Sequence, residues 1–194
     1  TIFSGGFLGV DIFFVISGYL ISYIILDDLN NNKFSLIKFY ERRARRILPV
    51  LIFVVLITLI VAWKFLAPGN LVSLSASILY LFVFTSNYFF YIDGLGYAAF
   101  DGLFKPLLHT WSLSLEEQFY IFFPLLFLLI FKYFKNYLYF FIILSFVSLT
   151  YAHFSFSTYP NEAFYFLHTR IWELLAGSII AYISINKNLL IFND

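Results

Sequence analysis

Long apolar runs separated by short polar segments follow one another along almost the whole chain. A helix of roughly 20 predominantly apolar residues crosses a bilayer. The pattern therefore predicts about six transmembrane helices, at 7–26, 47–66, 72–92, 113–131, 137–152 and 170–185. The predicted fold class is all-α, a polytopic transmembrane helical bundle.

The composition supports the prediction of a membrane protein and excludes some classes of partner. Hydrophobic residues make up 62% of the chain and charged residues 12%, with a mean hydropathy of +0.88, whereas soluble domains carry about a quarter charged residues. The lipid bilayer is thus the expected environment. A net charge of +1 gives no basic field for nucleic acid. The chain has no cysteine, and His109, His153 and His168 lack metal-ligand spacing, so we expect no metal site.

The charge distribution predicts an orientation. Six basic residues gather around the connection between the first two runs: Lys33, Lys38, Arg42, Arg43, Arg45 and Arg46. Short loops rich in lysine and arginine stay cytoplasmic. Counting one crossing for each predicted span then places 67–71 outside, 93–112 inside, 132–136 outside and 153–169 inside. Lys132 and Lys135 would fall outside, against the same rule, which leaves the later topology open.

Polar positions in the first span lie on one helical face. Asp11, Gly18 and Ser22 follow a spacing of i, i+7 and i+11. A carboxylate within a span usually faces the bundle interior or a watery cavity. The alternative is that Asp11 only caps the helix or lies at the membrane interface.

The arginine cluster Arg42, Arg43, Arg45 and Arg46 allows two interpretations. The first is a charge anchor at the lipid headgroups, which is common in membrane proteins and is favoured when the cluster is taken alone. The second is a phosphate site, because guanidinium groups bind phosphates in a bidentate manner and stay charged.

Ionisable and hydroxyl groups gather again at 109–120. Ser114 and Glu117 have the spacing of a capping box at a helix start. Glu116 has Ser112 at i−4 and Tyr120 at i+4, on a polar face that leads inward from His109. Such a carboxylate can orient a sugar hydroxyl or a catalytic imidazole; the alternative is an interfacial network that only fixes the helix entry. A hydrolase triad is not favoured, because no G-x-S-x-G elbow is present.

Arg170 and Glu173 form the last candidate group. Their i, i+3 spacing lets them pair on one helix, and Gly177 and Ala181 continue the Glu173 side with residues small enough for close helix approach. A purely structural ion pair explains them as well as a functional one.

Four ordered blocks resemble integral-membrane acyltransferase family 3, the O-antigen acetylase-like acyltransferases. They are GGFLGVDIFFVISGYLI at 5–21, which contains Asp11 and Ser17, FYERRARRILP at 39–49, PLLHTWSLSLEEQFY at 106–120, and RIWELLAG at 170–177. Any one block would only be suggestive, but the ordered set covers nearly the whole chain.

The resemblance implies an enzyme that moves an acyl group, usually acetyl, from cytoplasmic acyl-CoA to a hydroxyl of a glycan or lipid-linked sugar. Acetyl-CoA is then a donor substrate and no cofactor is bound. The resemblance places the family's Arg-x-Arg element at Arg43 and Arg45, which raises the phosphate interpretation. Glu116 and Glu117 fall on its acidic pair, preceded by His109, Trp111 and Ser112.

The resemblance also implies that 1–194 is a partial membrane acyltransferase domain of a bacterial inner membrane. The family's catalytic histidine and its partner arginine belong to a helix that would precede Thr1, and further helices, sometimes with a soluble esterase-like domain, would follow. We therefore expect these residues by themselves to be inactive. The acceptor stays open among lipopolysaccharide, capsule, peptidoglycan and other hydroxyl compounds.

The rival hypothesis is a polytopic transporter or flippase of lipid-linked sugars, in which Asp11, Glu116 and Arg170 line a path. Bare composition favours it, but the ordered blocks favour the acyltransferase, and no inverted repeat is visible. A purely structural membrane anchor would leave the charged groups near the helix ends unexplained.

Overall fold

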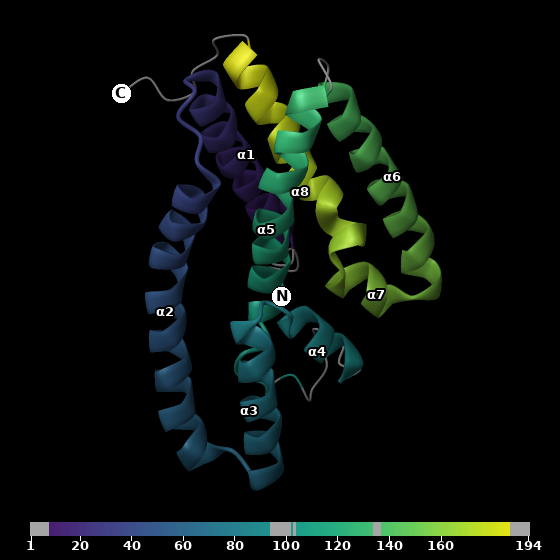
Figure 1. Cartoon of the computed structure of the whole chain (residues 1–194). Helices are drawn as coiled ribbons and strands as arrows, with labels where there is room; N and C mark the ends of the chain where they lie inside the picture. Colours follow the sequence, from purple (N-terminus) through teal and green to yellow (C-terminus); the bar gives the residue numbers. More distant parts are fainter. Residues whose placement is uncertain (1–7, 94–101, 103, 134–136, 187–194) are drawn as a thin grey trace. The chain divides into compact units, whose positions relative to one another are not determined.

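The computed structural model describes residues 8–93, 102, 104–133 and 137–186. The regular elements in this part of the chain are helices, so the predicted all-α class is confirmed there. In chain order they are α1 (Leu8–Asn30), α2 (Leu36–Phe65), α3 (Pro68–Phe82), α4 (Ser86–Ile92), α5 (Thr110–Tyr133), α6 (Tyr137–Thr158), α7 (Pro160–Tyr165) and α8 (Leu167–Asn186) (Figure 1).

Length and hydropathy support four membrane spans among the described residues, fewer than the six expected. These are α1, α2, most of α5 and α6. Helix α3 is apolar but has only 15 residues, which at 1.5 Å per residue is short for a bilayer core. Helix α8 has 20 residues, but Arg170 and Glu173 in its first turns lower its hydropathy.

The expected third span, 72–92, is wrong as a single helix. Helix α3 ends at Phe82 and α4 begins at Ser86, and between them Phe84 has a left-handed φ of 54°. The amide of Phe84 donates to the carbonyl of Leu81 at 3.0 Å, and the amide of Thr85 donates to that of Tyr80 at 2.8 Å. These bonds close the helix end as a left-handed C-terminal motif does. Hydropathy averaged over a long window does not detect this turn, because the three polar residues that follow it, Thr85, Ser86 and Asn87, lie between two apolar runs.

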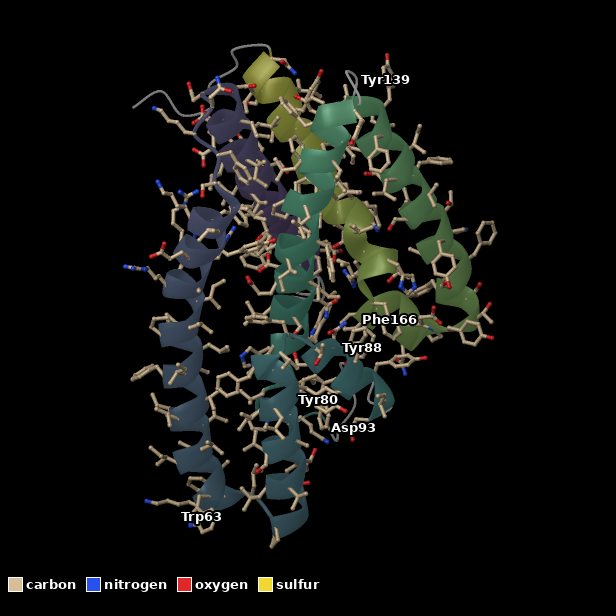
Figure 2. All side chains as sticks on the ribbon, viewed as in Figure 1. Trp63, Tyr80, Tyr88, Asp93, Tyr139 and Phe166 are labelled. Atoms are coloured by element: carbon tan, nitrogen blue, oxygen red, sulfur yellow. The ribbon has the colours of Figure 1, made fainter. Side chains whose placement is uncertain are left out.

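The chain divides into two compact units. One comprises Thr1–Phe34 and Glu116–Asp194, and the other Ser35–Leu115. In the second unit Leu51 and Val55 of α2 belong to one core with Leu74 and Leu81 of α3. Much of α2 is nevertheless exposed, as the outward side chains along it and the exposed Trp63 near its end show (Figure 2). Apolar side chains in such positions suit contact with lipid.

In the first unit α1 and α8 lie side by side at very short range (Figure 1). A Cβ atom added to Gly18 would lie 1.9 Å from the carbonyl oxygen of Leu174, and one added to Gly177 would lie 2.0 Å from that of Val15. The Ser22 hydroxyl donates to the Ser178 hydroxyl at 2.7 Å across the same contact. The predicted close approach through small residues is confirmed.

Helices α1 and α8 run parallel. Their contacts pair Asp11 with Arg170, Gly18 with Leu174 and Ser22 with Ser178, so the residue numbers rise together in both helices. The start of α8 and the adjoining α7 therefore lie at the end of the unit where α1 begins. The opposite end of α1 leads into the basic connection. The prediction that 153–169 lies on the same side as the basic connection is therefore wrong.

The remaining helices of this unit alternate in direction. Helix α6 is antiparallel to α8, because Ser148 bonds to the His168 carbonyl while the rings of Tyr137 and Tyr182 meet 4.9 Å apart. Helix α5 is antiparallel to α6, since the ring of Phe127 contacts that of Tyr137 and the ring of Phe123 contacts that of Phe141.

This alternation contradicts a further part of the parity count. Within the first unit, α5 ends and α6 begins on the side where α1 ends. The parity count puts the end of the fourth predicted span and the end of the first on opposite sides, so this arrangement contradicts that part of the count. Of the segments predicted at 93–112 and 132–136, residues 94–101, 103 and 134–136 lie outside the described residues.

Candidate functional site

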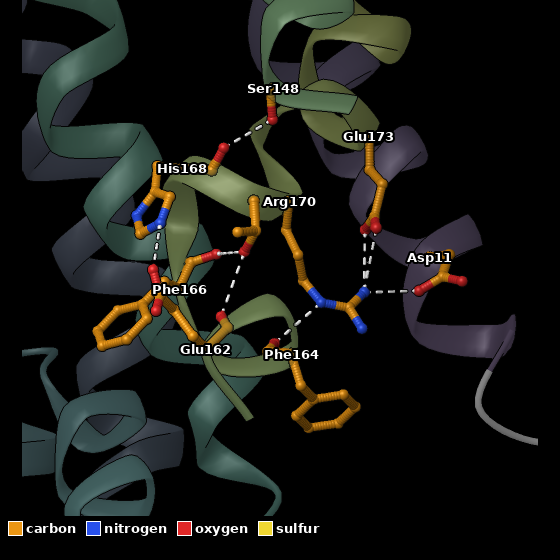
Figure 3. A network of polar contacts seen from close by, with 9 residues as sticks. Asp11, Ser148, Glu162, Phe164, Phe166, His168, Arg170 and Glu173 are labelled. Carbon is orange, nitrogen blue, oxygen red and sulfur yellow. Dashed lines mark hydrogen bonds and ion pairs between the residues drawn. The ribbon is translucent and has the colours of Figure 1, made fainter. Parts of the chain in front are cut away.

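An ion network joins α1 to α8 at the end of the first unit where α1 begins (Figure 3). Arg170 Nη1 donates to Asp11 Oδ1 at 2.8 Å and to Glu173 Oε1 at 3.1 Å, while its Nε donates to the Phe164 carbonyl at 3.0 Å. The ring of Phe164 lies 5.0 Å from the guanidinium carbon. Helices α1, α7 and α8 thus all contribute to the environment of one side chain.

The network holds one positive charge against two carboxylates. The Arg170 side chain is 14% exposed and that of Glu173 is 4% exposed, so the attraction acts where screening by water is weak. The predicted pair of Arg170 and Glu173 is confirmed. The bond to Asp11 was missed, because a helical period shows which face a residue occupies and not which distant helix it meets.

The acidic pair of α5 is buried, with Glu116 at 4% and Glu117 at 6% exposure. The Tyr120 hydroxyl donates to Glu116 Oε1 at 3.4 Å, as the predicted i+4 relation requires. The Ser112 hydroxyl instead donates to the His109 carbonyl at 3.1 Å, and the His109 side chain is exposed. The described contacts therefore join Tyr120 to Glu116, but they do not bring the imidazole of His109 to it.

The predicted capping box of Ser114 and Glu117 is wrong. Helix α5 begins at Thr110, because overlapping turns over 105–111 start it earlier than the apolar run does. Ser114 consequently lies in the second turn. Its hydroxyl oxygen lies 2.8 Å from that of Ser86 and accepts the Ser86 amide at 3.2 Å. Ser114 therefore ties α5 to α4 within the second unit instead of closing its own helix.

The arginine cluster occupies the second and third turns of α2. Arg42, Arg45 and Arg46 are exposed and Arg43 is half-buried. Arg45 bonds to Glu41 at 2.7 Å, with side chains 79% and 52% exposed. An exposed pair of this kind contributes at most about 1 kcal/mol. The arginines are accessible to an anion of either kind, a lipid headgroup or a soluble phosphate.

The other predicted site residues are buried in their helices. Ser17 lies on the buried face of α1 at 7% exposure, and Trp111 is 1% exposed at the start of α5. No group of three or more histidine, aspartate or glutamate side chains in the described part of the chain is arranged to hold a metal ion.

Sequence reasoning missed a second polar cluster, formed by Tyr151, Glu162 and His168. Glu162 Oε1 accepts a hydrogen bond from the Tyr151 hydroxyl at 3.1 Å and lies 3.4 Å from His168 Nε2. The sequence assigns His168 to no site, because its spacing from the other histidines does not suit a metal. The signal that could have revealed the cluster is the concentration of aromatic residues with one glutamate in a short connection.

The sequence matches a known family over most of its length. The family model described as "Acyltransferase domain" covers residues 1–190. A peptidoglycan O-acetyltransferase, OatA, of Listeria monocytogenes is 35% identical over 185 residues, which are 92% of this chain and 30% of that protein. The O-acetyltransferase OatA of Staphylococcus aureus is also 35% identical over 185 residues, 93% of this chain and 30% of its own length.

A relative of more similar size occurs in Haemophilus influenzae. This uncharacterized protein is 36% identical over 181 residues, which are 89% of this chain and 73% of that protein. No solved structure matches the chain. The chain spans 30% of the length of the two O-acetyltransferases described above.

Proposed function

The chain belongs to acyltransferase family 3 and is a multi-pass membrane protein, and on this premise we propose that it takes part in O-acetylation of a cell-surface glycan. The observation that carries the proposal is the family match over residues 1–190. The two O-acetyltransferase relatives support acetyl as the acyl group, and the Listeria relative supports a peptidoglycan-like acceptor.

The arginine cluster is the proposed donor site. The positive-inside rule places its loop in the cytoplasm, where acetyl-CoA is available. Arg43 and Arg45, flanked by Arg42 and Arg46, present planar donor groups that match the phosphates of coenzyme A. The exposure of Arg45 and the partial exposure of Arg43 support this role, because a soluble donor can reach them.

The acidic pair of α5 is the proposed acceptor site. Glu116 lies in the second turn of α5 and accepts a hydrogen bond from the Tyr120 hydroxyl. A carboxylate retains further lone pairs beyond one such bond, so Glu116 can also accept a hydrogen bond from a sugar hydroxyl. We assign supporting roles in this region to Glu117, His109, Ser112 and Trp111.

The proposed reaction is an acyl transfer from sulfur to oxygen. A general base removes the proton of the acceptor hydroxyl, and the oxygen attacks the thioester carbonyl. Hydrogen-bond donors stabilise the oxyanion as it develops. The carbon–sulfur bond then breaks, the coenzyme A thiolate leaves and takes up a proton, and the acceptor carries an O-acyl ester.

The proposal is tested with the complete reading frame that contains this chain, in a host that does not O-acetylate its surface glycans. We expect base-labile acetate on the purified glycans, and a loss of tenfold or more in the single variants Arg43→Lys and Arg45→Lys, because lysine keeps the charge but lacks the bidentate fork. Lys38→Gln, on the same helix, is the matched control and keeps activity.

Two results would count against the proposal. An unchanged amount of glycan acetate in both arginine variants would contradict the assignment of Arg43 and Arg45 to the donor site. No acetate at all from a correctly inserted protein would favour the transporter hypothesis.

A further inference from the structure

With the orientation that the positive-inside rule gives, the turn that joins α6, α7 and α8 lies on the outer side of the first unit. Helix α7 follows the end of α6 and lies beside the start of α8, at the end of α1 that is opposite the basic connection. An acceptor glycan outside the cell would approach this side. A contact with the acceptor is therefore expected on this side of the unit.

Three helices each contribute one polar side chain to this turn. Glu162 of α7 accepts a hydrogen bond from the Tyr151 hydroxyl of α6 at 3.1 Å, and the same oxygen lies 3.4 Å from Nε2 of His168 in α8. Figure 3 shows the contact between the Glu162 carboxylate and the imidazole. Nε2 of His168 therefore faces the carboxylate, and Nδ1 is the other ring atom that can take part in a hydrogen bond.

Aromatic rings frame the imidazole. The Phe166 ring stacks on His168 with 5.5 Å between centroids and 18° between planes, and the Tyr151 ring meets it edge-on at 5.2 Å. The backbone is fixed as well, because Ser148 donates to the His168 carbonyl at 2.7 Å. The arrangement is thus held in place by α6 before any ligand arrives.

This cluster is open, unlike the packed residues below it. The His168 side chain is 52% exposed, Tyr151 is 47% exposed and the Glu162 side chain is 22% exposed. Side chains that served only to pack the three helices would be buried, as Tyr165 and Thr169 are. The open groups combine aromatic ring surface with a carboxylate and an imidazole.

Aromatic ring surface beside a carboxylate and an imidazole suits the binding of a sugar ring. Its C–H faces are apolar and suit aromatic rings, whereas its hydroxyl and N-acetyl groups at the edge need both donors and acceptors. A carboxylate accepts strong hydrogen bonds from hydroxyls. A phosphate or another anion would instead be repelled by Glu162.

We propose that Tyr151, Glu162, Phe166 and His168 form a saccharide subsite that holds one sugar unit of the acceptor glycan on the outer face. The subsite rests on the proposed function for its acceptor class. Its role is to bind and orient the glycan, separately from the acidic pair of α5. It would raise the affinity for polymeric acceptors over single sugars.

The test measures binding by the complete protein in lipid nanodiscs. Chitotetraose, an oligomer of N-acetylglucosamine, is titrated against the unaltered protein and against Tyr151→Phe and Glu162→Gln, by calorimetry or ligand-observed NMR. We expect about tenfold weaker binding in both variants, the loss of one charge-assisted hydrogen bond. Tyr139→Phe, an exposed tyrosine of the same helix (Figure 2), is the matched control and binds normally.

The outcomes separate this subsite from the proposed function. Chitotetraose affinity that changes less than twofold in both variants overturns the subsite, even if acetyl transfer is intact; a lowered melting temperature with normal affinity likewise reduces the cluster to an interfacial anchor. Weaker binding in both variants, in a protein that transfers no acetyl group, supports the subsite and counts against the proposed function alone.

Discussion

The Arg170 side chain is largely buried, at 14% exposure, and is surrounded by polar and aromatic groups. It faces two carboxylates, a backbone carbonyl and an aromatic ring, and three helices meet around it. Glu173 is 4% exposed, so its charge depends on Arg170 for compensation. Arg45 offers a useful contrast, because its ion pair with Glu41 is open to water.

We predict that Arg170→Gln lowers the unfolding free energy by about 3 kcal/mol, since it leaves a buried carboxylate without its cation. Arg45→Gln, the matched surface variant, should lower it by less than about 1 kcal/mol. Unfolding by SDS titration in mixed micelles measures both. The double variant Arg170→Gln, Glu173→Gln should recover part of the loss, and equal losses in the Arg170 and Arg45 variants would contradict the buried network.

At the scale of elements, the seam between α1 and α8 depends on residues without side chains. The backbone of each helix fills the place where a Cβ atom of Gly18 or Gly177 would stand. The distances leave no room for a methyl group, and the nearest atoms are backbone atoms that a rotamer change cannot move. The hydrogen bond between Ser22 and Ser178 requires this close approach.

Gly18→Ala and Gly177→Ala should each force the two helices apart and lower stability by about 1–3 kcal/mol, the range for overpacked sites. Gly9→Ala, in the same helix α1, is the control because nothing lies within 4 Å of its added Cβ. Thermal unfolding in detergent should show lower midpoints for the first two variants alone. A midpoint for Gly18→Ala that matches Gly9→Ala would disprove the tight seam.

For the chain as a whole, the directions of the packed helices give the topology in place of a count of predicted spans. Parallel α1 and α8, with α5 and α6 alternating between them, put the end of α5 and the start of α6 on the side where α1 ends. At the opposite end of this unit, Arg170 is paired with Asp11 and Glu173.

The absence of cysteine makes this topology directly measurable. In spheroplasts, a membrane-impermeant maleimide should label Ser157→Cys at the end of α6. Lys33→Cys, in the basic connection, should react only after the membrane is permeabilised. Protection of Ser157→Cys together with labelling of Lys33→Cys would invert the whole assignment, and equal behaviour of the two sites would show that α1 and α8 are not parallel.

The sequence predicted those features that follow from spacing within one helix. The shared face of Asp11, Gly18 and Ser22, the pairing of Arg170 with Glu173 and the contact of Tyr120 with Glu116 are all confirmed. Each of these features follows from the 3.6-residue period of an α-helix. This period is a local property of the helix, so the sequence of one segment is enough to predict it.

The failures share a different cause, which is that backbone turns and helix partners are not encoded in apolar periodicity. Phe84 adopts a left-handed backbone conformation, although phenylalanine is not a residue type that favours it. Ser114 finds its partner Ser86 on another helix, so its capping pattern is a coincidence of spacing.

The distance in sequence between Asp11 and Arg170 has a consequence for synthesis. The two residues are 159 positions apart, and ribosomes add roughly 5–20 residues per second. Asp11 is therefore synthesised roughly 8–30 s before Arg170, the cation that pairs with its carboxylate. During that interval Asp11 has no cation from α8 beside it, so the nascent chain must keep this carboxylate near the membrane surface or in contact with the insertion machinery.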